Sequence, residues 1–276
     1  MSDALDLIGR SIEEQNAGES ASTRRQFVAG ATATLGGMGL LALPGVAAAH
    51  NGKGKWGQVR NDPQTILNVA ATAEVLATIV NTVGFDSGIL DGDPVTKRNV
   101  GAAAQEEYVH YNVLVSKGVG GRPVTKKIWV PDAVFATREG LLNTLEVGDQ
   151  IFVNAYLIGT IEFGLRGSGA LAATTAEFMG AEAVHRALAR QSLGKLGNDR
   201  VFMKFSQPEE ADAVNQGQKG FVRIETAVQQ LQAAGFGFGA PGAKPGRFYD
   251  FDAIVGKGGA GVPNDPDINT RVPVVS

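Results

Sequence analysis

The chain has 276 residues, of which 43% are hydrophobic and 19% charged, a composition typical of globular proteins rather than of disordered or fibrous chains. Its formal net charge of −3 supplies no basic field for binding nucleic acid. Cysteine is absent, which excludes disulfides, thiolate metal sites and a cysteine nucleophile. Only three histidines occur, His50, His110 and His185.

Residues 1–49 have the order of an export signal. A polar start is followed by Thr23-Arg24-Arg25-Gln26-Phe27, then by an uncharged stretch rich in Ala, Gly and Leu, and finally by Ala47-Ala48-Ala49. Paired arginines, a weakly apolar run and a small-residue end are typical of secretory signals, and these residues resemble a twin-arginine (Tat) signal. We therefore expect export through the Tat translocon, cleavage after Ala49, and a periplasmic or extracellular destination.

The first helix is expected after a linker over 50–61. Asp62 can cap the free amides of a helix that begins there, and Pro63 fits the first turn. Apolar residues then recur along a wide face until Gly84, where we expect the helix to end. No later segment reads as long and apolar enough to span a bilayer, so we expect no membrane anchor after cleavage.

Three further principal helices are expected. A loop over 85–100 precedes the second helix, over 101–117, and a Gly/Pro-rich connection then contains one extended piece at 127–130. The third helix covers 138–164, with Thr137 as its cap, and the fourth covers 168–194. Beyond them, 195–276 reads as an irregular extension with a weaker helix over 219–234. The fold expected is all-α: a bundle over 62–194 made of two antiparallel helix pairs.

Both histidines of the expected bundle follow a glutamate by three positions, in Glu107-Tyr108-Val109-His110 and Glu182-Ala183-Val184-His185. Residues i and i+3 of a helix lie on one face, so each pair can point into one pocket. The pattern also repeats at a distance. An acidic residue stands 33 positions before each Glu-x-x-His, Glu74 before the first and Asp149 before the second.

This set of side chains predicts a metal centre. Two helix pairs packed about a pseudo-twofold axis would bring together four carboxylates and two imidazoles, a donor set that suits two first-row divalent ions such as Fe or Mn. Four buried carboxylates without cations would repel one another, and each would lose its hydration. The predicted ligands are Glu74, Glu107, His110, Asp149, Glu182 and His185.

At these residues the chain resembles the ferritin-like superfamily, and more narrowly the exported ferritin-like domain family that includes desiccation-related proteins. The resemblance covers about residues 62–192. It rests on the segments 66–74, 107–110, 154–159 and 181–185 taken together. It implies a ferritin-like four-helix bundle in which Glu107 and Glu182 bridge two metals, with Glu74 and His110 on one side and Asp149 and His185 on the other.

One position departs from the family pattern, which has Glu where this chain has Asp149. The shorter side chain can still ligate, act through water, or leave one position weak, and Glu146 one turn earlier is a less favoured substitute. We expect Glu106 to be solvated and dispensable for metal retention. Tyr108 and Tyr111 are expected to pack, and Tyr156, two turns from Asp149, to pack or hydrogen-bond near the site.

Two functions remain open at the level of the sequence. The first is redox chemistry of a di-iron or di-manganese centre with dioxygen or peroxide, as in a ferroxidase, a catalase or an oxidase. The second is a non-catalytic stress or desiccation-related bundle in which the metal is structural or absent. The residues do not choose between the two metals, and they leave assembly as a homo-oligomer open.

Overall fold

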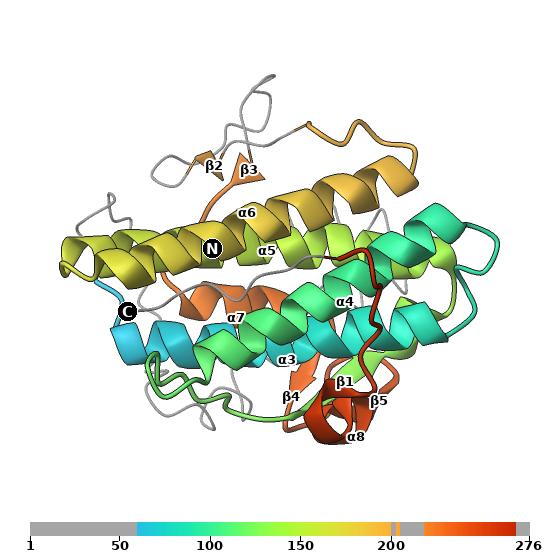
Figure 1. Ribbon diagram of the computed structural model, residues 1–276, viewed down its shortest axis with the longest axis horizontal. Coiled ribbons are helices and arrows are strands. Elements are labelled where there is room, and N and C mark those ends of the chain that lie inside the picture. The colour runs from blue at the N-terminus through green and yellow to red at the C-terminus, as the bar shows by residue number, and fades with distance from the viewer. Residues whose placement is uncertain (1–59, 200–202, 205–217, 269–276) are drawn as a thin grey trace.

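The computed structural model describes residues 60–199, 203–204 and 218–268, so the expected signal over 1–49 lies outside the described residues. The described part is mainly helical, with one small sheet of three strands and a pair of two-residue strands (Figure 1). The helices are α3 (Pro63–Asp86), α4 (Pro94–Leu114), α5 (Arg138–Leu165), α6 (Gly169–Ser192), α7 (Glu225–Ala233) and α8 (Phe251–Val255). The strands and 3-10 turns are β1 (Lys127–Pro131), η2 (Asp132–Phe135), β2 (Met203–Lys204), β3 (Gln218–Lys219), β4 (Gly237–Phe238), β5 (Gly246–Asp250) and η3 (Lys257–Gly259).

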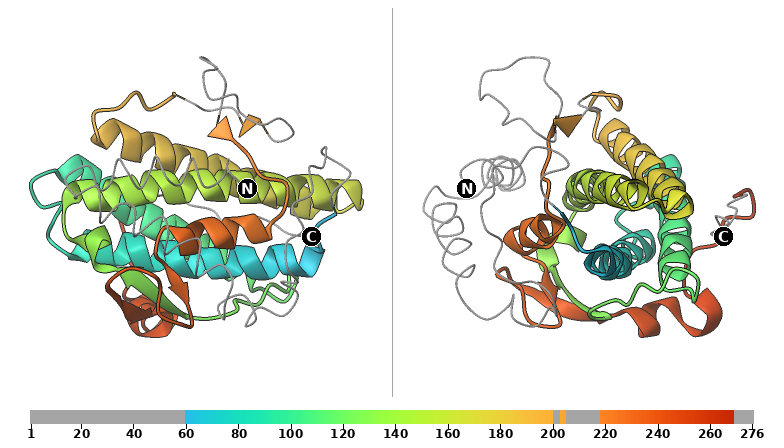
Figure 2. Two further views of the ribbon diagram at one scale, coloured as in Figure 1. Left: turned by 180° about the vertical axis from the view of Figure 1, so that it is seen from behind. Right: turned by 90° about the vertical axis from the view of Figure 1, so that its left-hand side faces the viewer.

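The four long helices form two hairpins, α3 with α4 and α5 with α6, which pack against each other (Figures 1 and 2). A long connection that contains β1 and η2 leads from the end of α4 to the start of α5. The predicted start signals of the first and third helices are confirmed. Asp62 accepts a hydrogen bond from Thr65 N at 2.8 Å, and Thr137 accepts one from Gly140 N at 3.0 Å.

The second helix begins seven residues earlier than the expected 101, so the prediction of a loop over 85–100 is wrong for its second half. Asp93 caps α4 by accepting from Thr96 N at 3.1 Å, and Pro94 occupies the first turn. This is the same Asp-Pro signal that begins α3. The prediction missed this signal because the Gly, Pro and Asn residues around it are typical of loops.

Helix α3 also corrects an expectation. By length and composition it could cross a membrane, contrary to the prediction that no such segment follows the signal. However, 83% of its most apolar window is buried among the other elements. Its apolar character is thus that of a core helix.

The C-terminal region is more ordered than the expected irregular tail. The predicted weak helix exists as α7, and it lies alongside α3 and α5 (Figure 2). Strands β4 and β5 pair antiparallel with the two sides of β1, giving the order β4-β1-β5. Ile128 and Val130 of β1 are fully buried. The fold is therefore mainly helical rather than purely α, because β1 forms a sheet with two strands of the C-terminal region.

Candidate metal centre

All six predicted ligand residues lie on the four long helices, and all are buried. Each contributes from the helix on which the sequence placed it: Glu74 on α3, Glu107 and His110 on α4, Asp149 on α5, and Glu182 and His185 on α6. Glu74, Glu107 and Glu182 have no exposed surface. The i, i+3 spacing puts each glutamate on the same face as its histidine, as expected.

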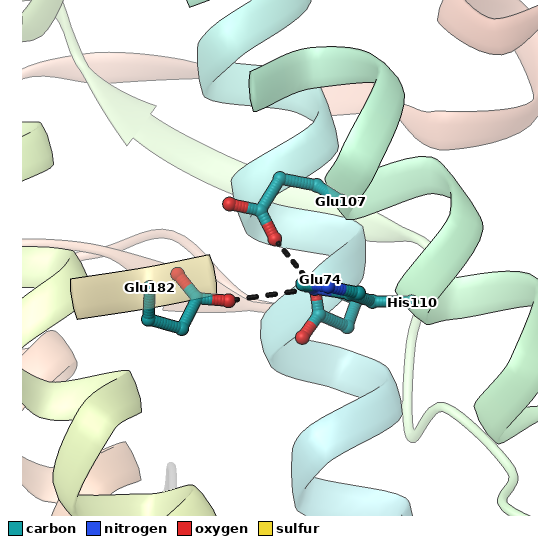
Figure 3. Close-up of side chains that lie close together, drawn as sticks. All are labelled: Glu74, Glu107, His110 and Glu182. Atoms are coloured by element: carbon teal, nitrogen blue, oxygen red, sulfur yellow. Dashed lines mark ion pairs between the residues drawn. The ribbon is translucent and has the colours of Figure 1, made fainter. Parts of the chain in front are cut away.

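The first half of the centre is grouped around His110 (Figure 3). Its Nδ1 atom lies 3.3 Å from Glu107 Oε2, 3.5 Å from Glu182 Oε1 and 3.7 Å from Glu74 Oε2. One donor atom from each of these four residues lies within 4.8 Å of the others. Four buried donors at this separation could hold a metal ion.

The second half is grouped around His185. Its Nδ1 atom lies 3.0 Å from Glu107 Oε1 and 3.6 Å from Glu182 Oε2. These are the carboxylate oxygens that do not face His110. Glu107 and Glu182 therefore each turn one oxygen toward each imidazole.

Asp149 lies near this second half but outside the four-residue group. It is 4% exposed, and its carboxyl interacts electrostatically with the side chains of Glu182 and His185. The guanidinium of Arg186, also buried, acts on the same carboxyl. The structure thus places Asp149 at the edge of the centre, where its carboxyl also interacts electrostatically with Arg186.

Glu106 is not simply solvated, as the sequence suggested. Its Oε2 atom lies 2.6 Å from Nε2 of His185, and its side chain is 34% exposed. This hydrogen bond lowers the pKa of Glu106 and so keeps it ionised. If a metal is bound, a carboxylate acceptor at Nε2 would hold a proton there and leave the lone pair of Nδ1 of His185 for the metal. The contact joins α4 to α6, so the pattern of residues along either helix alone could not predict it.

Glu146 does not substitute for Asp149. It forms ion pairs with Arg190 and with Lys195, the latter at 2.7 Å. Its carboxylate is therefore engaged by two cations of α6 and the segment that follows α6.

Aromatic side chains enclose the centre. Tyr156 is buried and donates a hydrogen bond to Glu74, as the sequence allowed, and burial raises the pKa of its hydroxyl well above the usual range. Phe178 stacks on the imidazole of His110 with a centroid distance of 4.0 Å. Tyr108 and Tyr111 pack with each other and with Phe251, as expected. Tyr156 and Phe178 lower the polarity around Glu74 and His110, which strengthens the electrostatic interactions there.

The carboxyls of Glu74 and Asp149 favour the protonated form. Burial raises the pKa of Glu74 to about 8, and the charge of Glu107 adds to this shift. Burial also raises the pKa of Asp149 well above its usual range, with the charge of Glu182 acting in the same direction. Both shifts have the sign expected of a carboxylate that has lost its hydration beside another carboxylate.

The two imidazoles favour the charged form. Burial alone would lower the pKa of His110, but its contacts with Glu74, Glu107 and Glu182 outweigh burial and raise that pKa well above its ordinary value. Burial is likewise outweighed at His185, where the hydrogen bond to Glu106 and the contact with Glu107 raise the pKa.

The donor set itself fits a metal. The following buried donor atoms make no hydrogen bond of acceptable geometry: Glu74 Oε2, both oxygens of Glu107, His110 Nδ1, Asp149 Oδ2, both oxygens of Glu182, and His185 Nδ1. Buried polar atoms without partners are costly, by about 1–3 kcal/mol each. These atoms belong to carboxylates and imidazoles gathered in one pocket, a donor set that could hold a metal ion.

No family model, curated protein or solved structure matches this chain.

Proposed function

We propose that the protein is an exported, ferritin-like four-helix bundle that binds two divalent Fe or Mn ions and carries out redox chemistry with dioxygen or peroxide. One observation carries the proposal. The two oxygens of Glu107 and the two of Glu182 are divided between His110 and His185. A carboxylate divided in this way suits two ions side by side, whereas a single ion would use one imidazole and leave the other without a role.

The arrangement of the helices supports the ferritin-like part of the proposal. Two hairpins joined by one long connection are the topology of bundles of that class, in which the ligands project inward from all four helices. The small sheet and α7 are additions outside this arrangement.

Glu74 and His110 would hold one ion, Asp149 and His185 the other, with Glu107 and Glu182 shared between them. The ions would supply one-electron redox steps toward dioxygen or peroxide. The protein's own residues have simpler tasks. Glu106 holds the proton of His185 at Nε2, Tyr156 orients Glu74, and Phe178 keeps water from the face of His110.

Metal analysis of purified variants tests the proposal. Glu107→Ala and Glu182→Ala each remove an oxygen pair that serves both ions, so we expect both variants to lose nearly all bound Fe or Mn. Glu177→Ala is the matched control, because Glu177 lies on α6 like Glu182 but is exposed. Equal metal content in all three variants would contradict the proposal.

A second candidate function has its own support. Because the raised pKa values of Glu74, Asp149, His110 and His185 favour protonated side chains in the pocket, the bundle need not collapse without metal, as expected of a non-catalytic stress or desiccation-related protein. Chelation followed by thermal unfolding separates the redox proposal from the form of this alternative in which no metal is bound. The redox proposal predicts a clear fall in Tm when metal is removed. An unchanged Tm in a protein purified without metal favours the second function.

Export is part of the proposal and rests on the sequence around Arg24 and Arg25, outside the described residues. Replacing both arginines by lysine should retain the protein in the cytoplasm of the host if the Tat route is used. Unchanged export of that variant would exclude this route.

A further inference from the structure

A small apolar cavity, here called the inner cavity, lies between α3, α5 and α7. Its volume is about 30 Å³. Ala70 of α3, Phe152 of α5 and Val228 of α7 are among the buried side chains that line it. A single water occupies about 10–15 Å³ on this scale, so the inner cavity has room for a molecule of about two or three heavy atoms.

Tyr156 connects the inner cavity with the candidate metal centre. Its side chain belongs to the lining, and its hydroxyl donates a hydrogen bond to Glu74. Thr72 and Ala73, which directly precede Glu74 on α3, also line the cavity. A molecule in the inner cavity therefore contacts a side chain that is itself bonded to a predicted metal ligand.

The lining of the inner cavity is almost wholly apolar. It contains no charged side chain, and its polar side chains are Thr72, Tyr156 and Thr175. Thr72 donates to the carbonyl of Asn68 at 2.7 Å, and Thr175 donates to that of Leu171 at 2.9 Å. Because all three hydroxyl hydrogens are used within the protein, none is left to donate into the cavity. A buried water needs two to four polar partners, so we expect the inner cavity to be dry.

A larger cavity provides access from the surface. It measures about 700 Å³, and its lining includes the exposed residues Ala136 and Glu139. Phe152 and Leu231 line both cavities, so the two cavities adjoin at these side chains. Side chains in a packed core still change rotamer, which lets a small apolar molecule pass such a wall.

We propose that the inner cavity binds dioxygen, and that dioxygen rather than peroxide is the oxidant delivered to the metal centre. Dioxygen is apolar and has two heavy atoms, which matches the size and the lining of the cavity. Hydrogen peroxide would lose its hydrogen bonds to water there, at a cost that the apolar lining does not offset. The binding of dioxygen does not depend on a metal, whereas its use as an oxidant rests on the proposed redox function.

Ala227 and Val228 allow the inner cavity to be filled or enlarged from one helix. Both lie on α7, are buried, and belong to its lining. Ala227→Leu fills space in the cavity, and Val228→Ala opens space in it. Because filling a packed core can strain the fold, the enlarging variant provides an independent test. Ala173→Leu is the matched control, since Ala173 lies on α6, is exposed, and is not part of the lining.

Diffraction from crystals of the metal-free protein under xenon pressure tests binding. Xenon is an apolar probe that enters dry apolar cavities. We expect a xenon peak in the inner cavity of the wild type and of Ala173→Leu, a stronger peak in Val228→Ala, and loss of the peak in Ala227→Leu. An ordered water in place of xenon, or a cavity that stays empty in both the wild type and Val228→Ala, would overturn the proposal.

The rates at which the Fe²⁺-loaded protein consumes dioxygen and hydrogen peroxide test the choice of oxidant. Ala227→Leu should slow the reaction with dioxygen and leave the reaction with peroxide unchanged, whereas Ala173→Leu should change neither. Equal slowing of the two reactions would refute the assignment of dioxygen. Metal content of the same samples separates this proposal from the redox function. A xenon peak in a protein that takes up no metal refutes only the redox function, and metal uptake without a xenon peak refutes only the cavity proposal.

Discussion

Glu106 illustrates how a side chain next to the ligands sets the properties of a ligand. The sequence predicted the six candidate ligands, because spacing along a helix determines which side chains share a face. It did not predict the role of Glu106, because that role depends on a contact between α4 and α6. Glu106 lies four residues before His110, so its position on the same face was the one signal available.

Replacing Glu106 by alanine should weaken metal binding on the His185 side. Without the carboxylate, the proton is no longer held at Nε2 and the ring loses its orientation. Losses of about 10–100-fold in metal affinity are typical for such partners. Titration with Mn²⁺ should show one weakened binding step in Glu106→Ala and none in Glu177→Ala. Two unchanged steps in Glu106→Ala would show that the contact has no such role.

Metal binding should release protons. The raised pKa values of Glu74, Asp149, His110 and His185 favour their protonated forms in the metal-free pocket, and bound divalent ions would displace protons from them. Apparent affinity should therefore rise with pH, and most steeply below pH 8, the approximate pKa of Glu74. Calorimetry in buffers of different ionisation enthalpy counts these protons. Uptake of metal without proton release would contradict the charge assignment.

Among the helices and strands, those determined by local interactions were predicted from local patterns in the sequence. Caps at Asp62 and Thr137 and the period of apolar residues predicted α3, α5 and α6 to within two residues at each end. Strands β4 and β5 could not be predicted in the same way. β4 has only two residues, and both strands pair with β1, more than 100 positions earlier in the chain. Only the tertiary structure makes them strands.

The cap at Asp93 should contribute measurably to stability. Its carboxylate accepts from Thr96 and also pairs with Arg138 at 2.8 Å, which links the start of α4 to that of α5. Asp93→Ala should lower the free energy of unfolding by about 1–2 kcal/mol in denaturant titrations. Asp91→Ala is the control, because Asp91 lies in an exposed ion pair with Lys97. Equal losses in the two variants would contradict the role of the cap.

The same cap predicts a dependence on acid. Hydrogen bonds from Thr96 and Arg138 lower the pKa of Asp93 from 3.8 to about 2. A lowered folded pKa means that the contribution is complete above pH 3.8 and is lost as the pH falls toward 2. The difference in stability between the wild type and Asp93→Ala should shrink over that range. A difference that stays constant down to pH 2 would exclude this linkage.

At the scale of the whole molecule, the C-terminal region belongs to the packed core. Ile224, just before α7, is 1% exposed and part of the same apolar cluster as α3 and α5. Ile224→Ala should therefore cost about 2–5 kcal/mol of unfolding free energy. Leu196→Ala should cost little, because Leu196 is 70% exposed. Similar thermal unfolding of the two variants would mean that α7 is only loosely attached.

If two ions bind, we expect one beside His110 and the other beside His185, with Glu107 and Glu182 between them. Anomalous diffraction from crystals soaked in Mn²⁺ tests it most directly. We expect two peaks in the interior of the bundle, one next to Nδ1 of His110 and the other next to Nδ1 of His185. Peaks confined to the protein surface, with protonated side chains filling the interior, would contradict it.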